Sequence, residues 1–431
     1  MAVLPRDLQC DQHRHVHAVL LDVAAEPDQR ARGVLIAARV SHVAAPDDRG
    51  GRRRGCMRGS LSSLPGTSMK TTLLRRAVAA VALTMAASLA HAATYAYVSN
   101  SDSRDISVFS VDTANGALTA IETVPVDGTV MPMALSPDHR RLYAALRSTP
   151  YRVVSFAINP LDGRLIELGR APLADSMAYV STDASGRYLF SASYGGNLLA
   201  VNRIGADGVA GDVRQTVKTG PMAHAIRQSP DGRYAFASVL GADAWLRLPF
   251  DASTGILTDD TTPAYRLPDK SGPRHFVFSS NGRFAYLIDE LDGKLHVLAL
   301  SHGDADARPI QTVSILPPDF HGDKPWGADL HLTPDGRFLY ASERTSSTLA
   351  GYRVDATSGR LARIGTFATE QQPRGFAIDP SGKYLLAAGQ LSPTLAVYRI
   401  DGHTGHLDAI GKYPVGKGAN WIEIVTYDGT N

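Results

Sequence analysis

The chain has 431 residues, two cysteines, and 44 basic against 42 acidic residues. Residues 1–92 hold 13 of the Lys and Arg residues, 7 of the Asp and Glu residues, and both cysteines, Cys10 and Cys56, so the remainder has a net charge of −4. The basic balance of the whole chain is therefore no evidence for a nucleic-acid partner. The remainder has no cysteine, which excludes a disulfide framework and a cysteine metal site.

Residues 69–92, MKTTLLRRAVAAVALTMAASLAHA, have the layout of a secretory signal peptide. A basic start is followed by a short apolar stretch, too short for a comfortable membrane span, and by an A-x-A cleavage pattern. Because a signal peptide must stand first, we expect Met69 to be the true start, residues 1–68 to be untranslated or disordered, and residues 93–431 to form the folded domain. The expected location is periplasmic or secreted without membrane attachment, and cytoplasmic if the signal is not used.

One polar turn recurs at intervals of 46 to 54 residues in the folded domain. Its copies are SPDHRRLY (136–143), DASGRYLF (183–190), SPDGRYAF (229–236), SSNGRFAY (279–286), TPDGRFLY (333–340) and DPSGKYLL (379–386). Each copy places Asp, Asn or Gly between two strands of alternating polarity, which is the pattern of a β-hairpin. A second strand–turn–strand segment follows each copy, so every unit contains four strands.

Four antiparallel strands at this period are typical of a β-propeller. The first unit begins directly at TYAYVSN (94–100) without an inner strand, and the missing strand stands at the other end as ANWIEIVT (419–426). The sequence therefore predicts an all-β, seven-bladed propeller of four-stranded antiparallel blades. Pairing of the C-terminal strand with the N-terminal strands would close it and remove the open sheet edges. A β-sandwich would fit the strands but not seven equal units.

Two positions in each unit are expected to meet at one mouth of the central channel. The first begins the inner strand and the second ends its antiparallel neighbour, so both lie at the same end of the blade. The first ring contains Met131, Ala178, His224, Arg274, Ala328 and Arg374, and the second contains Arg147, Tyr194, Leu240, Glu290, Arg344 and Gln390. A histidine, a carboxylate and several arginines should therefore converge in one pocket.

Such a pocket favours anionic ligands and acid–base chemistry. Arginine forms paired hydrogen bonds with carboxylate or phosphate, and a carboxylate beside a histidine is a plausible acid–base pair. The alternative, in which these charges only join neighbouring blades through salt bridges, stays open. Asp329 and His331 alternate along an inner strand and are expected to line the channel or to hydrogen-bond each other.

Several other residues are interpreted as structural. Trp326 and Trp421 are expected to pack, and Glu343 to form a salt bridge between blades. The histidine spacings do not match a metal site, and neither a phosphate-binding glycine loop nor a G-x-S-x-G elbow is found. We therefore expect no metal, no cofactor and no serine nucleophile.

Three stretches resemble the lactonase family of seven-bladed propellers, and within it the bacterial propeller-type 6-phosphogluconolactonases. They are GPRHFVFSSNGRFAYLIDEL (272–291), WGADLHLTPDGRFLYASERTSSTLAGYRV (326–354) and EQQPRGFAIDPSGKYLLAAGQLSPTLAVYRI (370–400). The resemblance extends over residues 94–425. It implies metal-free hydrolysis of 6-phospho-D-glucono-1,5-lactone to 6-phosphogluconate, a step of the pentose phosphate pathway.

The resemblance also implies a catalytic set. Related propellers that cyclise muconates use a histidine, two arginines and a glutamate, and by local motif these fall on His224, Arg274, Glu290 and Arg344. We expect Glu290 to take a proton from water, with His224 as the other candidate base, and His224 to protonate the leaving ring oxygen. The two arginines would stabilise the oxyanion.

The predicted substrate-binding set is Arg374, Arg147, His331 and Gln390. The first two would hold the phosphate or the hydroxyl groups of a small lactone. Because the pathway enzyme of the family is cytoplasmic, a used signal peptide would point to an unphosphorylated aldonolactone instead. Two alternatives are a non-catalytic secreted binding propeller and a muconate-lactonising enzyme.

Overall fold

The computed structural model describes residues 93–300, 307–322 and 324–428. The predicted signal peptide at 69–92 and the segment 1–68 lie outside the described residues. Strands make up nearly all of the regular structure, with one short 3₁₀ turn, η1 (Leu240–Ala242).

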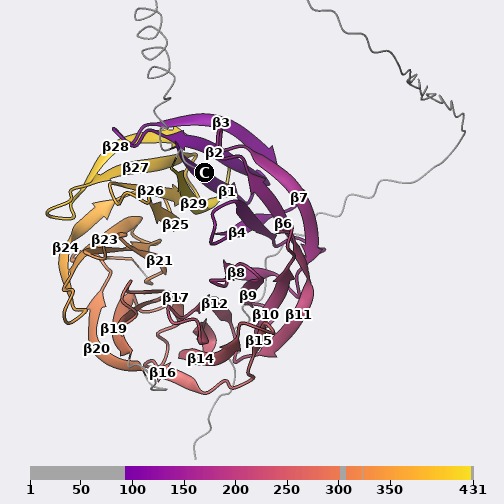
Figure 1. The fold of residues 1–431 in the computed structure, drawn as a ribbon. Coiled ribbons are helices and arrows are strands. Elements are labelled where there is room, and N and C mark those ends of the chain that lie inside the picture. The colour runs from indigo at the N-terminus through magenta and orange to yellow at the C-terminus, as the bar shows by residue number, and fades with distance from the viewer. Residues whose placement is uncertain (1–92, 301–306, 323, 429–431) are drawn as a thin grey trace, which may run out of the picture. The chain divides into compact units, whose positions relative to one another are not determined.

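Seven antiparallel sheets stand in a ring around a common axis, as Figure 1 shows. The inner strands are β29 (Ala419–Tyr427), β4 (Val130–Leu135), β8 (Met177–Thr182), β12 (Ala223–Gln228), β17 (Pro273–Phe278), β21 (Gly327–Leu332) and β25 (Pro373–Ile378). The second strands are β1 (Ala93–Asn100), β5 (Arg141–Leu146), β9 (Tyr188–Ser193), β13 (Tyr234–Val239), β18 (Phe284–Asp289), β22 (Phe338–Glu343) and β26 (Tyr384–Gly389).

Two further strands complete each blade toward the outside of the ring. The third strands are β2 (Asp105–Val111), β6 (Arg152–Ile158), β10 (Leu198–Ile204), β14 (Ala244–Asp251), β19 (Lys294–Leu300), β23 (Thr348–Val354) and β27 (Thr394–Ile400). The outer strands are β3 (Leu118–Pro125), β7 (Leu165–Pro172), β11 (Ala210–Lys218), β15 (Ile256–Leu257), β16 (Pro263–Arg266), β20 (Ala307–Ser314), β24 (Leu361–Ala368) and β28 (Leu407–Pro414). The predicted seven-bladed fold is confirmed.

One blade departs from the four-stranded pattern. Its outer strand is divided into β15 and β16, and both pieces pair with β14, so this sheet has five strands. The chain between the two pieces is rich in Asp and Thr and ends at Pro263. Asp disfavours strand structure and proline cannot donate a ladder hydrogen bond, which explains the interruption.

The ring closes through the two ends of the folded domain. β29 pairs antiparallel with β1, with Ala93 opposite Tyr427 and Tyr97 opposite Glu423. The first sheet in the sequence therefore has the order β29-β1-β2-β3, and the predicted closure is confirmed. Closure satisfies the backbone groups that two free sheet edges would leave unpaired.

The core lies between neighbouring blades rather than in the channel. The middle strands are buried on both faces, as in β9 and β18, where every residue is buried. Outer strands such as β11 alternate between exposed and less exposed residues. Strands covered on both faces must be apolar on both faces, which explains the Val-, Leu- and Ala-rich runs of the middle strands.

The recurring turn depends on a left-handed residue. Five copies place glycine there, for example Gly232 and Gly382, with φ near +70° (74° and 72°). The first copy has His139 instead, with φ of 58°. Non-glycine residues rarely adopt this conformation, so the turn geometry is kept in this blade in spite of the side chain.

A buried carboxyl–imidazole pair lies inside the blade of β18 and β19. Asp289 is fully buried, and its Oδ2 lies 2.7 Å from Nε2 of His296. Its Oδ1 has no hydrogen-bond partner among the described residues. Burial raises the pKa of Asp289 to about 7, against a lowering effect of His296.

We expect this pair to make stability depend on pH. The pKa of Asp289 is raised on folding from an unfolded value of about 3.9, so its contribution is fully present below pH 4 and is lost as pH rises through 7. This loss lowers the unfolding free energy of the wild type as pH rises. In Asp289→Asn the decrease should be smaller by up to about 4 kcal/mol. Urea unfolding at pH 5 and pH 8 measures the part of this decrease that lies above pH 5, about 2.7 kcal/mol. Asp127→Asn, on an exposed carboxylate, is the control, and equal pH dependence in wild type and Asp289→Asn would contradict the prediction.

Candidate active site

Three charged side chains from two neighbouring blades meet at one mouth of the channel. Arg274 begins the inner strand β17, Glu290 follows β18, and Arg344 follows β22. Oε2 of Glu290 accepts hydrogen bonds from Nε of Arg274 and from Nη2 of Arg344, both at 2.9 Å. The two arginine side chains are each 1% exposed, so the carboxylate neutralises charge in a largely dry setting.

Trp326, just before β21, is part of the same cluster. Its indole Nε1 donates to Oε1 of Glu290 at 3.3 Å, and the guanidinium of Arg344 lies 3.9 Å from the ring centroid. Trp326 is 37% exposed, and it packs on Arg344 as well as donating to Glu290. It stands in the loop that leads into an inner strand, outside the two rings that the repeats define.

The charges of the cluster shift one another's pKa values. Burial raises the pKa of Glu290, but Arg274, Arg344 and Arg374 outweigh it and lower the pKa below its usual range. Burial, together with the charge of Arg274, lowers the pKa of Arg344 to about 9. Three donors already occupy the carboxylate, so Glu290 is a weak proton acceptor.

Two further arginines surround this cluster. Burial, with repulsion from Arg274, Arg344 and Arg147, lowers the pKa of Arg374 well below its ordinary value. Within the described ranges, the side chain of Arg374 has neither a hydrogen bond nor an ion pair. Arg147 donates from Nε to Oγ of Ser176 at 2.9 Å. The mouth therefore has a positive excess that an anionic ligand would neutralise.

His224, on β12, completes the group that the repeats predicted. It is 3% exposed, and its Nδ1 is buried without a hydrogen-bond partner among the residues that the structure describes. Its ring lies 6.0 Å from that of Tyr194 and 5.1 Å from that of His275, centroid to centroid. Burial and the nearby Arg274 hold its pKa well below 6.5, so the imidazole is neutral at pH 7.

A hydrogen-bonded layer lies one residue further along the inner strands. Nδ1 of His275 lies 2.8 Å from Oδ1 of Asp329, and Nη1 of Arg274 lies 3.3 and 3.4 Å from the two ring nitrogens of His275. Arg274 also donates to the carbonyl of Ala328. Burial and Arg274 lower the pKa of His275 to about 3, so a neutral ring supports the guanidinium. The sequence analysis missed this role of His275, although alternation along a strand places it beside the ring position.

Three predicted positions need comment. His331 does not join the arginines. It stands four residues after Gly327, which is roughly 13 Å further along β21. There its Nε2 lies 3.1 Å from Oδ2 of Asp329. Gln390 follows β26 as Glu290 follows β18, so the two residues hold equivalent positions in different blades. The backbone N–H of Gln390 donates to the carbonyl of Gln372. Oxygens of Glu343 accept from the amide of Trp326 and from Ser346 in its own blade, so the predicted blade-to-blade salt bridge is wrong.

Comparison with known proteins identifies the family. The family model described as Lactonase, 7-bladed beta-propeller matches residues 90–424. The chain belongs to this family. It is 40% identical over 329 residues to the 6-phosphogluconolactonase of Serratia proteamaculans (strain 568), covering 76% of this chain and 98% of that protein. It is 39% identical over 332 residues to the 6-phosphogluconolactonase of Pectobacterium carotovorum subsp. carotovorum (strain PC1), covering 77% of this chain and 98% of that protein.

A solved structure agrees with this assignment. The periplasmic gluconolactonase PpgL of Pseudomonas aeruginosa superposes with a TM-score of 0.70 at 30% identity, covering 78% of this chain and 99% of that one. The chain is thus a lactone hydrolase similar to 6-phosphogluconolactonase. Among the described residues of this lactonase, no cluster of three His, Cys, Asp or Glu side chains is suited to a metal ion. That same part of the chain has no helix that could span a membrane.

The structure brings three kinds of group together at this mouth. Arg274 and Arg344 are buried guanidinium groups that share one carboxylate. His224 is a buried neutral imidazole, and the side chain of Arg374 is a cation without an ion pair among the described residues. The predicted set of His224, Arg274, Glu290 and Arg344 is brought to one end of the channel, and its catalytic role stays a prediction.

Proposed function

We propose that the enzyme hydrolyses 6-phospho-D-glucono-1,5-lactone to 6-phosphogluconate. The observation that supports this substrate is the unpaired Arg374 beside Arg274 and Arg344, because a phosphate is the ligand that guanidinium groups bind in paired hydrogen bonds. The names of the relatives from Serratia and Pectobacterium support the same reaction. We infer that Arg374 and Arg147 hold the phosphate, with Gln390 at the edge of the sugar.

Water attack is assigned to His224 rather than to Glu290. The imidazole is neutral and has a buried nitrogen without a partner, whereas three donors hold the carboxylate. His224 takes a proton from a water molecule while the oxygen of that water bonds to the lactone carbonyl carbon. It returns that proton to the ring oxygen as the carbon–oxygen bond breaks, leaving a hydroxyl and a carboxylic acid, which ionises in water.

The arginines act on the carbonyl oxygen, and Glu290 positions them. As the tetrahedral intermediate forms, the oxygen becomes negative, and donors from Arg274 and Arg344 stabilise it. The carboxylate of Glu290 holds both guanidinium groups in fixed orientation before substrate arrives. Preformed donors need no reorganisation during the reaction, which is the main source of such stabilisation.

A panel of lactones tests the proposal. Purified residues 93–431 would be assayed by proton release with 6-phosphogluconolactone, glucono-1,5-lactone and a muconate, against the spontaneous rate of each. We expect the phosphorylated lactone to give the highest kcat/KM. No acceleration of any lactone would overturn the proposed function and leave a binding propeller, and turnover of the muconate alone would indicate lactonisation. The comparisons favour neither of these two alternatives.

Arg374→Ala should separate phosphate recognition from chemistry. Loss of a charge-assisted contact of about 1.5–3 kcal/mol predicts a KM for the phosphorylated lactone that is about 10- to 150-fold higher. The KM for glucono-1,5-lactone should change far less, because that substrate has no phosphate. Steady-state kinetics with both substrates measures the effect, and an equal rise in both KM values would place the phosphate elsewhere.

An unphosphorylated aldonolactone is the second candidate substrate. The structural similarity to a periplasmic gluconolactonase favours it, together with the predicted signal peptide at residues 69–92. We propose that the chain is exported and cleaved before Ala93. N-terminal sequencing of the protein from the periplasmic fraction tests the location, and a protein retained in the cytoplasm with Met69 or an earlier residue at its start would exclude it.

A further inference from the structure

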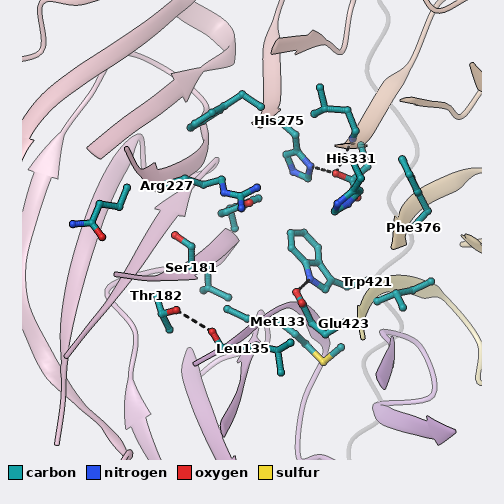
Figure 2. Close-up of a pocket in the computed structure, with 18 of the residues that line it drawn as sticks. Met133, Leu135, Ser181, Thr182, Arg227, His275, His331, Phe376, Trp421 and Glu423 are labelled. Atoms are coloured by element: carbon teal, nitrogen blue, oxygen red, sulfur yellow. Dashed lines mark hydrogen bonds and ion pairs between the residues drawn. The ribbon is translucent and has the colours of Figure 1, made fainter. Parts of the chain in front are cut away.

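A cavity lies at the end of the ring opposite to the candidate active site. It has a volume of about 520 Å³ and is lined by the middle and C-terminal ends of the inner strands. Its polar lining includes Arg227 on β12, His331 on β21 and Glu423 on β29 (Figure 2). We call it the far-end cavity. The candidate active site stands at the other end of the ring, where the inner strands begin and the second strands end, beyond the layer of His275 and Asp329.

Aromatic rings form a rigid wall of this cavity. The ring of Trp421 lies 5.4 Å from that of Tyr179 and 5.7 Å from that of His275, and Tyr179 lies 5.1 Å from His275, all edge to face. The indole Nε1 donates to Oε1 of Glu423 at 2.8 Å, which fixes the ring. Trp421 packs in this wall as predicted, and its ring also lines the cavity.

The polar groups converge on that surface. Figure 2 shows Arg227, His331 and Glu423 pointing from three sides toward the space beside Trp421. The one hydrogen bond of the Glu423 side chain within the described chain is that to Oε1, and burial raises the pKa of this carboxyl to about 7. The cavity thus offers a guanidinium donor, an imidazole and a carboxyl that both donates and accepts.

The charge of the far-end cavity is close to balanced. The positive charge of Arg227 acts on Glu423. The pKa of Asp329 is well below its usual range because His331 and His275 outweigh the raising effect of burial. The active-site mouth instead has four arginines around one carboxylate. A net anion gains little in a balanced cavity, whereas hydroxyl groups can use donors and acceptors together.

We propose that the far-end cavity is a second binding site, for an uncharged polyhydroxylated ring such as a sugar or an unphosphorylated sugar lactone. The apolar face of the ring lies against Trp421. Its hydroxyls donate to Glu423 and accept from Arg227 and His331. The volume suits one six-membered sugar ring with some bound water.

The test uses two probes and a reciprocal pair of variants. Methyl β-D-glucopyranoside is uncharged and has no lactone to hydrolyse, and 6-phosphogluconate is an anion for the active-site mouth. Binding of each is measured by saturation-transfer NMR and calorimetry on residues 93–431. Arg227→Met and Glu423→Leu change the far-end cavity, and Arg374→Ala changes the active-site mouth.

We expect the wild-type enzyme to bind both probes at different sites. Arg227→Met and Glu423→Leu should weaken the glucoside by about tenfold or more, and 6-phosphogluconate should bind them unchanged, which also shows that they fold. Arg374→Ala should show the reverse pattern. The absence of glucoside binding, its persistence in both cavity variants, or its loss in Arg374→Ala alone would overturn the proposal. Glucoside binding requires no lactone turnover, so this result is independent of the proposed function.

Discussion

His224→Gln should lose about 10²–10⁴-fold in kcat on the preferred lactone, with little change in KM. Glutamine approximates the size of imidazole and its hydrogen bonding, but it cannot carry a proton from water to the ring oxygen. The His224 side chain is buried beside the rings of Tyr194 and His275. We therefore expect the substitution to leave the arginines in place. Steady-state kinetics, with the spontaneous hydrolysis subtracted, measures the change.

Two comparisons make this result specific. Tyr194→Phe, which alters a neighbour of the ring without removing a base, should keep kcat within about tenfold of wild type. The pH profile of wild-type kcat should also lack a fall near pH 6.5 on the acid side, since the pKa of His224 lies well below that value. Full turnover in His224→Gln combined with inactivity in Glu290→Gln would return the role of base to Glu290.

Glu290→Gln should cause the largest loss of stability of any single change at the site. The substitution removes the one carboxylate that forms ion pairs with both Arg274 and Arg344, each of which has a side chain 1% exposed. Removing one partner of a buried ion pair costs about 3–5 kcal/mol. Urea unfolding at neutral pH measures this cost, and Glu167→Gln, which removes the more exposed partner of Arg170, should cost no more than about 1 kcal/mol.

An added anion should restore part of that stability. In Glu290→Gln the arginines would bind inorganic phosphate more tightly than in wild type, and binding to the native state raises the unfolding free energy. The increase in midpoint with phosphate should therefore be larger in the variant. A variant as stable as wild type, or one that phosphate does not stabilise, would show that Glu290 does not neutralise these charges.

The repeats determined the fold and one end of the channel. Six copies of the same turn and a strand missing from the start predicted seven blades and their closure by the C-terminal strand, as found in the pairing of β29 with β1. The same repeats placed His224, Arg274 and Glu290 at one end. This works because side chains in strands alternate and equivalent positions in successive blades stand at the same height around the axis.

The contacts within the site required the tertiary structure. The stacking of Trp326 on Arg344 depends on a loop whose path no repeat defines. The support of Arg274 by His275, and the position of His331 in the far-end cavity, depend on which residue of a neighbouring blade each side chain meets. Neighbouring blades contact through side-chain packing rather than through ladder hydrogen bonds. The sequence therefore determined the ring and the height of each residue, and the packing between blades decided its partners.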